Sequence, residues 1–147
     1  MMRHWEFSKD GNSDALALFL RHYSARPDRP NSKRFVGPGE KIVLLTPDRT
    51  ALFVWRYEQH RRDNQYGINC SVFRNEGYSL ASSSELIKEA VLIAEQRWPG
   101  KRFFTFVNTS KITSSNPGYC FQKAGWVKCG YTKVNKLLIL EYLPIEV

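Results

Sequence analysis

The chain has 147 residues, of which 42% are hydrophobic and 24% are charged, and its formal net charge is +8. These values are typical of one globular domain, which we expect to span residues 1–147. No apolar run approaches the roughly 18 residues that cross a bilayer, so the sequence excludes a membrane-spanning helix.

The positive charge has two interpretations. Many basic residues precede residue 63, which suits a polyanionic partner such as nucleic acid. A basic but merely soluble surface explains the charge equally well. The cysteines, Cys70, Cys120 and Cys129, form no close metal-type pair, so we expect no metal site. Their odd number favours a reducing compartment, and we expect a cytoplasmic protein.

The N-terminal part is predicted to contain a strand, a helix and an irregular segment. Met2–Phe7 is a short candidate strand, and Asn12 or Ser13 then caps a helix. From Ser24 to Glu40, prolines and glycines break regular structure, so this segment is either a substrate-facing arm or an unstructured connection. The apolar stripe of the helix is Leu16, Phe19, Leu20 and Tyr23.

Three consecutive strands are expected next. Lys41–Thr46 and Thr50–Tyr57 are rich in β-branched and aromatic residues, and Pro47-Asp48-Arg49 is the turn between them. A polar loop, Glu58 to Gln65, leads to a third strand, Gly67–Phe73. Tight connections of this kind predict an antiparallel meander.

A strand–loop–helix unit follows the meander. The loop Arg74–Ala81 leads to a helix over Ser82–Arg97, which begins with a capping box formed by Ser82 and Glu85. Backbone N–H groups at such a helix start can bind a phosphate. The next strand, Arg102–Val107, should lie parallel to the strand before the helix.

The C-terminal part is predicted to hold a short helix, Gly118 to Ala124, and two strands, Trp126–Cys129 and Lys136–Leu143. The fold class is therefore α+β. We expect a mixed sheet of about six or seven strands flanked by three or four helices.

This order of elements resembles that of the GCN5-related N-acetyltransferases (GNAT), and two local patterns support the resemblance. Arg74-x-x-Gly77-x-Ser79 is similar to the family's phosphate loop, with a serine in the last small position. Phe121-Gln-Lys-Ala-Gly-Trp126 resembles the Tyr-Glu-Lys-Leu-Gly-Phe segment that ends the family's fourth helix.

The resemblance implies that acetyl-CoA or another acyl-CoA binds between two strands that separate. The backbone at Val72 and Phe73 would hold the pantetheine arm, and the loop would hold the pyrophosphate. The residues that the resemblance assigns to the cofactor are Val72, Phe73, Arg74, Gly77, Ser79, Ser82, Asn108 and Asn116.

The catalytic groups are less evident. Many GNAT enzymes have a tyrosine that protonates the leaving thiolate at the position of Phe121, which has no proton to give. Tyr119 and Cys120 are the nearby replacements, and the third alternative is that no side-chain acid is used. Glu58 and His60 are candidate bases, although both also suit an exposed hairpin loop.

We expect an acyltransferase whose acceptor is an amine on nucleic acid, with DNA favoured over tRNA. The compact size, the altered phosphate loop and the short helix after Asn116-Pro-Gly are similar to those of the GNAT-like proteins with which phages modify DNA bases, including the Mom type. Such a protein would work in the host cytoplasm. The alternatives are a toxin that acetylates aminoacyl-tRNA, and an inactive scaffold that binds nucleic acid or protein. A homodimer is left open. The expected nucleic-acid contacts are Arg26, Arg29, Lys33, Arg34, Arg56, Arg61 and Arg62.

Overall fold

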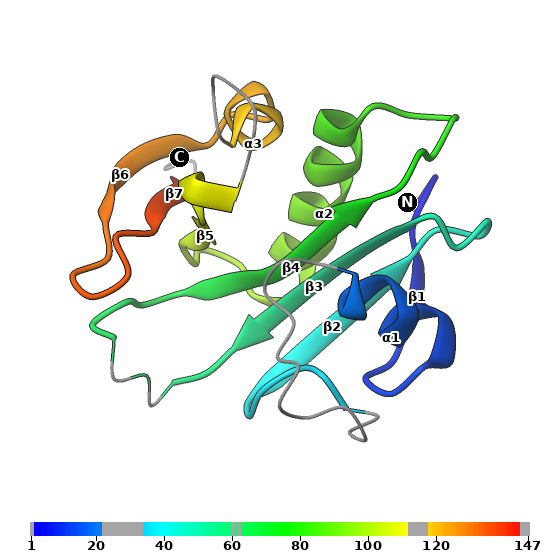
Figure 1. The fold of residues 1–147 in the computed structure, drawn as a ribbon, viewed down its shortest axis with the longest axis horizontal. Coiled ribbons are helices and arrows are strands. Elements are labelled where there is room, and N and C mark those ends of the chain that lie inside the picture. The colour runs from blue at the N-terminus through cyan, green and yellow to red at the C-terminus, as the bar shows by residue number, and fades with distance from the viewer. Residues whose placement is uncertain (1, 22–33, 60, 62, 112–117, 145–147) are drawn as a thin grey trace.

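The computed structural model describes residues 2–21, 34–59, 61, 63–111 and 118–144. One seven-stranded sheet runs through the molecule in the order β1-β2-β3-β4-β5-β7-β6 (Figure 1). Only β4 and β5 are parallel; the other neighbours are antiparallel. The strands are β1 (Glu6–Ser8), β2 (Glu40–Leu45), β3 (Ala51–Tyr57), β4 (Ile68–Asn75), β5 (Phe103–Val107), β6 (Val127–Tyr131) and β7 (Leu138–Tyr142).

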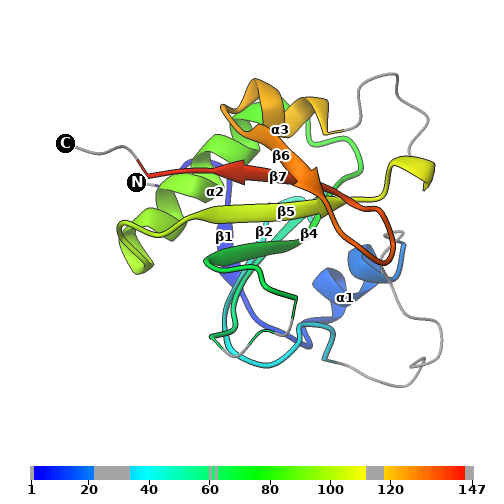
Figure 2. The same ribbon diagram turned by 90° about the vertical axis from the view of Figure 1, so that its left-hand side faces the viewer.

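The three α-helices of the described residues cover the two faces of the sheet. Helices α2 (Ser83–Arg97) and α3 (Tyr119–Lys123) lie on one face and α1 (Ser13–Leu20) lies on the other, while a short 3-10 helix, η1 (Thr109–Lys111), follows β5 (Figures 1 and 2). The mixed sheet and the strand–helix–strand unit with its parallel pair confirm the predicted fold class.

Two hydrophobic clusters follow from this arrangement. The larger lies between the sheet and α2, and it includes fully buried Trp55, Phe53 and Leu86. The smaller lies under α1 and includes Leu18 and Val54. Alternate residues of β3 point into the two clusters, as the pleat of a strand requires.

The predicted stripe of α1 is wrong. The side chains that the helix buries are Ala15 and Leu18, whereas Leu20 is 51% exposed. Asn12 is the N-cap and accepts from two backbone N–H groups, which sets the rotation of this eight-residue helix. Phe19 is only half-buried and stacks on Phe35, and Tyr23 lies outside the described residues.

The first strand is shorter than predicted because its first half is bound to a helix. The backbone N–H groups of Arg3, His4 and Trp5 donate to the carboxylate of Glu89 on α2, at 2.9 to 3.2 Å. The indole of Trp5 also donates to the carbonyl of Leu86. Only Glu6–Ser8 therefore pairs with β2.

The ends of two other strands also differ from the prediction. Strand β4 continues for two residues past Phe73, because Arg74 and Asn75 still pair with Leu52 and Ala51. At the other end of the chain, reciprocal hydrogen bonds between Thr132 and Leu137 close the turn before β7, so that strand begins later than predicted.

In the part of the chain that the structure describes, no helix is long and apolar enough to cross a membrane.

Candidate active site between β4 and β5

Strands β4 and β5 separate after three residue pairs. Ile68, Asn69 and Cys70 pair with Phe103, Phe104 and Thr105, and the pairing then stops. Beyond that point β4 pairs only with β3, and β5 only with β7. Figure 1 shows the two halves of the sheet diverging there. The separation leaves one backbone edge of Ser71–Asn75 without a strand partner in the described part of the chain. This edge includes Val72 and Phe73, the residues that the family resemblance assigns to the pantetheine arm.

A bulge in β4 lies at the start of this split. Val54 pairs with Val72 and Trp55 with Cys70, so Ser71 is the extra residue. Cys70 belongs to the α2-side core, whereas Val72 belongs to the α1-side core. Without the bulge, two residues separated by one would point to the same face. The bulge therefore bends β4 and changes its direction at the point where it leaves β5.

A side-chain hydrogen bond supports Cys70 and Thr105, the last residue pair of the β4–β5 ladder. The hydroxyl of Thr105 donates to the carbonyl of Cys70 at 2.9 Å, and both residues are buried. Burial also raises the pKa of the Cys70 thiol well above its usual range, so this thiol stays protonated and is no nucleophile.

The loop after β4 begins with an Asn-centred turn. The side-chain oxygen of Asn75 accepts from the backbone N–H groups of Gly77 and Tyr78, at 3.0 and 2.9 Å. Gly77 has a φ of +118°, which strains any other residue. These two N–H groups are thus already hydrogen-bonded and are not free to bind a phosphate. The turn directs the chain toward α2.

Arg74 does not point freely into the loop. Its Nε donates to Glu76 at 2.6 Å and its Nη1 to the carbonyl of Arg21 at 2.8 Å. Arg21 also forms a two-bond contact with Glu76. Hydrogen bonds from Arg21 and then Arg74 lower the pKa of Glu76 to about 2. A phosphate that binds Arg74 must therefore compete with this carboxylate.

The start of α2 provides the free donors of the loop. The Oγ of Ser82 accepts from the N–H of Glu85, and the N–H of Ser82 donates back to the Glu85 carboxylate, so the predicted capping box is confirmed. This use leaves Ser82 no free group for a phosphate. Among the described residues, no acceptor is found for the backbone N–H groups of Ser79, Leu80, Ser83 and Ser84.

Helix α3 lies beside α2 at the open side of the split (Figure 1). Phe121 is buried and contacts the edge of Phe73 on β4, with ring centroids 5.9 Å apart, and it also packs against Trp126. Tyr119 is 53% exposed and Cys120 is half-buried against the core. Position 121 is thus a packing residue, and the nearest exposed hydroxyl of the helix belongs to Tyr119.

The remaining candidates lie apart from the split or have partners. Glu58 follows β3 and lies 3.8 Å from Arg56, an ion pair that is half-buried. Asn108 follows β5, and its side-chain oxygen accepts from Ser110. Several predicted residues lie outside the described part of the chain: His60, Asn116, Arg26, Arg29, Lys33 and Arg62.

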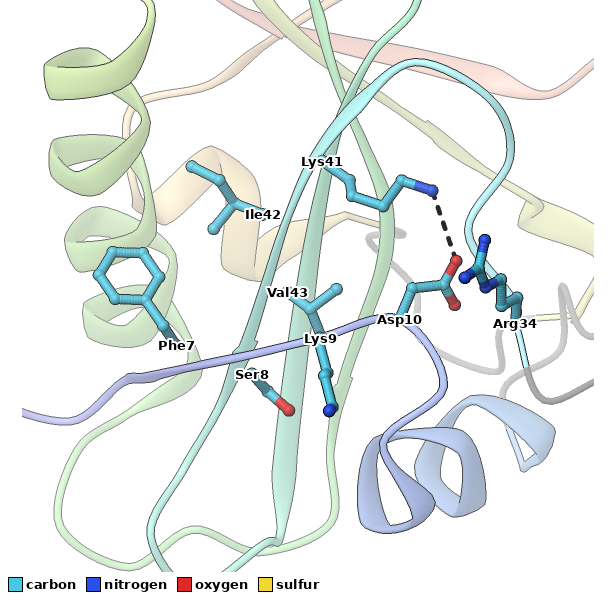
Figure 3. Close-up of a pocket in the computed structure, with 8 residues that line it drawn as sticks. All are labelled: Phe7, Ser8, Lys9, Asp10, Arg34, Lys41, Ile42 and Val43. Atoms are coloured by element: carbon cyan, nitrogen blue, oxygen red, sulfur yellow. Dashed lines mark hydrogen bonds and ion pairs between the residues drawn. The ribbon is translucent and has the colours of Figure 1, made fainter.

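Arg34 lies at the far edge of the sheet. It lines a hollow of about 450 Å³ between β1 and β2, together with Lys41 and Asp10. Figure 3 shows Lys41 and Arg34 directed to the same side as Asp10, and Lys41 lies 3.5 Å from its carboxylate. This hollow is separated from the split by β2, β3 and β4, so it does not belong to the same site.

Two residues at the split were missed by the sequence analysis. Asn69 and Thr105 are both buried polar residues. Thr105 is the one polar residue of β5, and a single polar residue in an apolar strand is a signal that the sequence carries. Asn69 has no such signal, because β4 also contains Ser71, Arg74 and Asn75.

Comparisons with known proteins support the fold. No protein-family model matches the chain. No curated protein matches it either. Among solved structures, an acyl-CoA N-acyltransferase from Pseudomonas aeruginosa is similar, with a TM-score of 0.57 and 10% identity over 93% of this chain and 98% of the other. The chain therefore has the GNAT-like fold that its order of elements predicts.

Proposed function

We propose that the protein is an acyl-CoA-dependent N-acyltransferase. The observation that carries this proposal is the split after Cys70 and Thr105, which frees an edge of β4 beside a helix start with unused N–H groups. A pantetheine arm can form strand-like hydrogen bonds with such an edge. Phosphates suit the N–H groups of Ser83 and Ser84. The similar structure is named an acyl-CoA N-acyltransferase.

An acyl-CoA would supply an activated acyl group as a thioester. The chain's own part is to hold the donor and the amine together in the split and to exclude water by Phe73 and Phe121. The product amide forms as the carbon–sulfur bond breaks, and one proton moves from the nitrogen to the thiol. Tyr119 is the exposed proton donor closest along the chain to Phe121, and Glu58 remains the described candidate base.

The acceptor in this proposal is an amine carried by nucleic acid, with a phage DNA base as the finer alternative. The net charge of +8 supports a polyanionic partner. Lys128, Lys133 and Lys136 are exposed on β6 and the β6–β7 turn, and no ion pair is found for them among the described residues. Because Val107 pairs with Leu138, that turn lies beside the open end of β5.

Binding of acetyl-CoA tests the first part of the proposal. Acetyl-CoA at millimolar concentration should raise the melting temperature, since a ligand that binds only the folded state stabilises it. The shift should be lost when Gly77 is replaced by Val, whose branched side chain disfavours the positive φ of the loop. Absence of a shift with the wild-type protein would sink the acyltransferase proposal.

A second candidate function is a nucleic-acid-binding scaffold without acyl transfer. Two observations favour it. Phe121 stands where the family's motif has a proton-donating tyrosine, and the guanidinium of Arg74 already pairs with the carboxylate of Glu76. This candidate predicts salt-dependent nucleic-acid binding with no response to acetyl-CoA, so the same thermal experiment separates the two.

A further inference from the structure

A row of side chains crosses the sheet on the face opposite α2. The strand register aligns Arg56 with Asn69, Asn69 with Phe104, and Phe104 with Glu141. The neighbours of Asn69 along β4 pack into the α2-side core, so by alternation the row points to the other face. Asn69 lies one residue before Cys70, which forms the last β4–β5 pair before the split. We refer to Arg56, Asn69, Phe104 and Glu141 as the Asn69 row.

Charged groups around the Asn69 row are balanced. The guanidinium carbons of Arg61 and Arg102 lie 5.2 and 4.9 Å from the centroid of the Phe104 ring. The three described arginines of this region have carboxylate partners: Arg56 pairs with Glu58, Arg61 with Asp63, and Arg102 with Glu141. The charges of the described residues here therefore balance.

Two hydrogen-bonding atoms in this balanced region are unused. Asn69 is 6% exposed, and its Oδ1 is buried with no hydrogen-bond partner among the described residues. The Nη1 of Arg61 is also buried and has no partner in that part of the chain. Burial and the charge of nearby Arg61 lower the pKa of Arg56, the cross-strand neighbour of Asn69, so Arg61 lies close to the row. A buried polar group without a partner destabilises a fold, so two of them in this region suggest that a ligand satisfies them.

We propose that Asn69 and Arg61 form the acceptor subsite, and that it takes an amine with an uncharged hydrogen-bond acceptor beside it. Oδ1 of Asn69 would accept from the amine N–H, next to the split where the acyl carbon must lie. Nη1 of Arg61 would donate to the neighbouring carbonyl oxygen or ring nitrogen. This inference rests on the proposed acyltransferase function and names its acceptor chemistry.

The charge balance explains why the neighbouring group is uncharged. Asp63 already matches the charge of Arg61, so a carboxylate or phosphate gains little there, whereas a neutral oxygen or nitrogen satisfies the free N–H. In the reaction, the neutral amine forms the carbon–nitrogen bond as the carbon–sulfur bond breaks, and one proton passes from the nitrogen to the leaving thiolate, which departs as the thiol. Asn69 orients the amine and takes no proton.

Nucleic acids present this chemistry in two forms. The α-amino group of an aminoacyl ester on tRNA lies beside a carbonyl oxygen, and the exocyclic amine of a nucleobase lies beside a ring nitrogen. Both forms present an N–H donor and an uncharged acceptor to the same pair of side chains. Separate arms of the experiment distinguish them.

The test uses the full chain and three variants. Asn69→Leu removes the amide with little change in volume, and Arg61→Met keeps the packing over Phe104 without the N–H groups. Arg97→Met is the matched control, because Arg97 also lies over an aromatic ring, 5.8 Å from the centroid of Trp98, and pairs with Glu40. Transfer of labelled acetyl groups from acetyl-CoA is measured on bulk aminoacyl-tRNA and on single-stranded DNA.

The expected result separates binding, stability and transfer. Asn69→Leu should melt no lower than wild type, because it removes an unpaired buried amide, and its response to acetyl-CoA should be unchanged. Its kcat/KM for the acceptor should fall about tenfold or more, the loss expected for one hydrogen bond. Arg61→Met should show the same loss, and Arg97→Met should not.

The opposing outcomes are distinct. Transfer to either acceptor with equal rates in all variants would overturn the subsite and leave the acyltransferase function intact. An acetyl-CoA response with transfer to neither acceptor would overturn the acceptor chemistry. No acetyl-CoA response in wild type would overturn the proposed function itself.

Discussion

Glu76 alters the charge of the loop in which we propose that the cofactor phosphates bind. Its carboxylate receives hydrogen bonds from both Arg21 and Arg74 at the beginning of the loop. It therefore neutralises the cation that the family's motif directs at a pyrophosphate, and it adds a negative charge near the anion. A residue at an unspecified position of the motif can thus change the charge that the motif presents.

Replacement of Glu76 by Gln should strengthen the binding of acetyl-CoA. The change removes a negative charge near the phosphates and releases Arg74, so we expect the dissociation constant to fall several-fold, on the order of one charge-assisted hydrogen bond. Isothermal titration calorimetry measures it. Glu95→Gln, on the exposed face of α2, is the control and should bind like wild type. Unchanged affinity in Glu76→Gln would show that the phosphates do not reach this loop.

The same carboxylate should make stability depend on pH in the acid range. The pKa of Glu76 is lowered from 4.5 to about 2, so the ionised form stabilises the fold. This contribution is fully present above pH 4.5 and is lost as the pH falls toward 2. The difference in melting temperature between wild type and Glu76→Gln should therefore shrink on acidification through this window. A constant difference would contradict the assignment.

At the scale of elements, the carboxylate of Glu89 determines where the first strand starts. Glu89 on α2 binds the backbone of residues 3 to 5, so this segment lies on the helix and only three residues join the sheet. The bulge at Ser71 has a comparable effect on β4, where one extra residue changes the face to which Val72 points. Both features determine strand ends that side-chain patterns alone do not reveal.

Glu89→Ala should destabilise the protein by about 1–3 kcal/mol, because it leaves several backbone N–H groups without their acceptor. Denaturant unfolding measures the loss. The control is Glu95→Ala on the exposed side of the same helix, which should change the free energy of unfolding by less than about 0.5 kcal/mol. Equal effects of the two substitutions would show that the N-terminal segment contributes no stability through Glu89.

At the scale of the whole molecule, the net charge is +8, and the basic residues differ in whether they pair with carboxylates. Many described arginines, among them Arg21, Arg49, Arg56, Arg61, Arg74, Arg97 and Arg102, have carboxylate partners. The exposed lysines of β6 and its following turn have none in the described part of the chain. The phosphates of a nucleic acid are therefore expected to bind at the β6–β7 end, whereas the arginines near Glu58 already have carboxylate partners.

Substitution of Lys128, Lys133 and Lys136 by Ala should reduce the salt dependence of binding to duplex DNA. Each lost phosphate contact lowers the slope of log K against log salt by about 0.9, so the triple variant should lose roughly two to three units. Filter binding over a salt series measures the slope. Lys88→Ala, on α2, is the control. An unaltered slope would place the nucleic acid on another surface.

The sequence by itself determined the class of the fold and the order of its elements. Runs of β-branched and aromatic residues located β2, β3 and β4, and the Ser82–Glu85 capping box located the start of α2, because both signals depend on neighbours in the chain. The order strand, helix, strand predicted the parallel pair, which the register of β4 with β5 confirms. These features depend on residues that are close together in the chain, so they can be recognised from the sequence.

Only the tertiary structure decided what the site contains. Arg74 is recognisable in the motif, but its pairing with Glu76 and Arg21 depends on the end of α1 lying beside β4. Asn69 becomes notable because Arg56, Phe104 and Arg61 meet around it from three other segments. Contacts between residues distant in sequence determine which polar groups are satisfied and which remain free, and that distinction defines the candidate site.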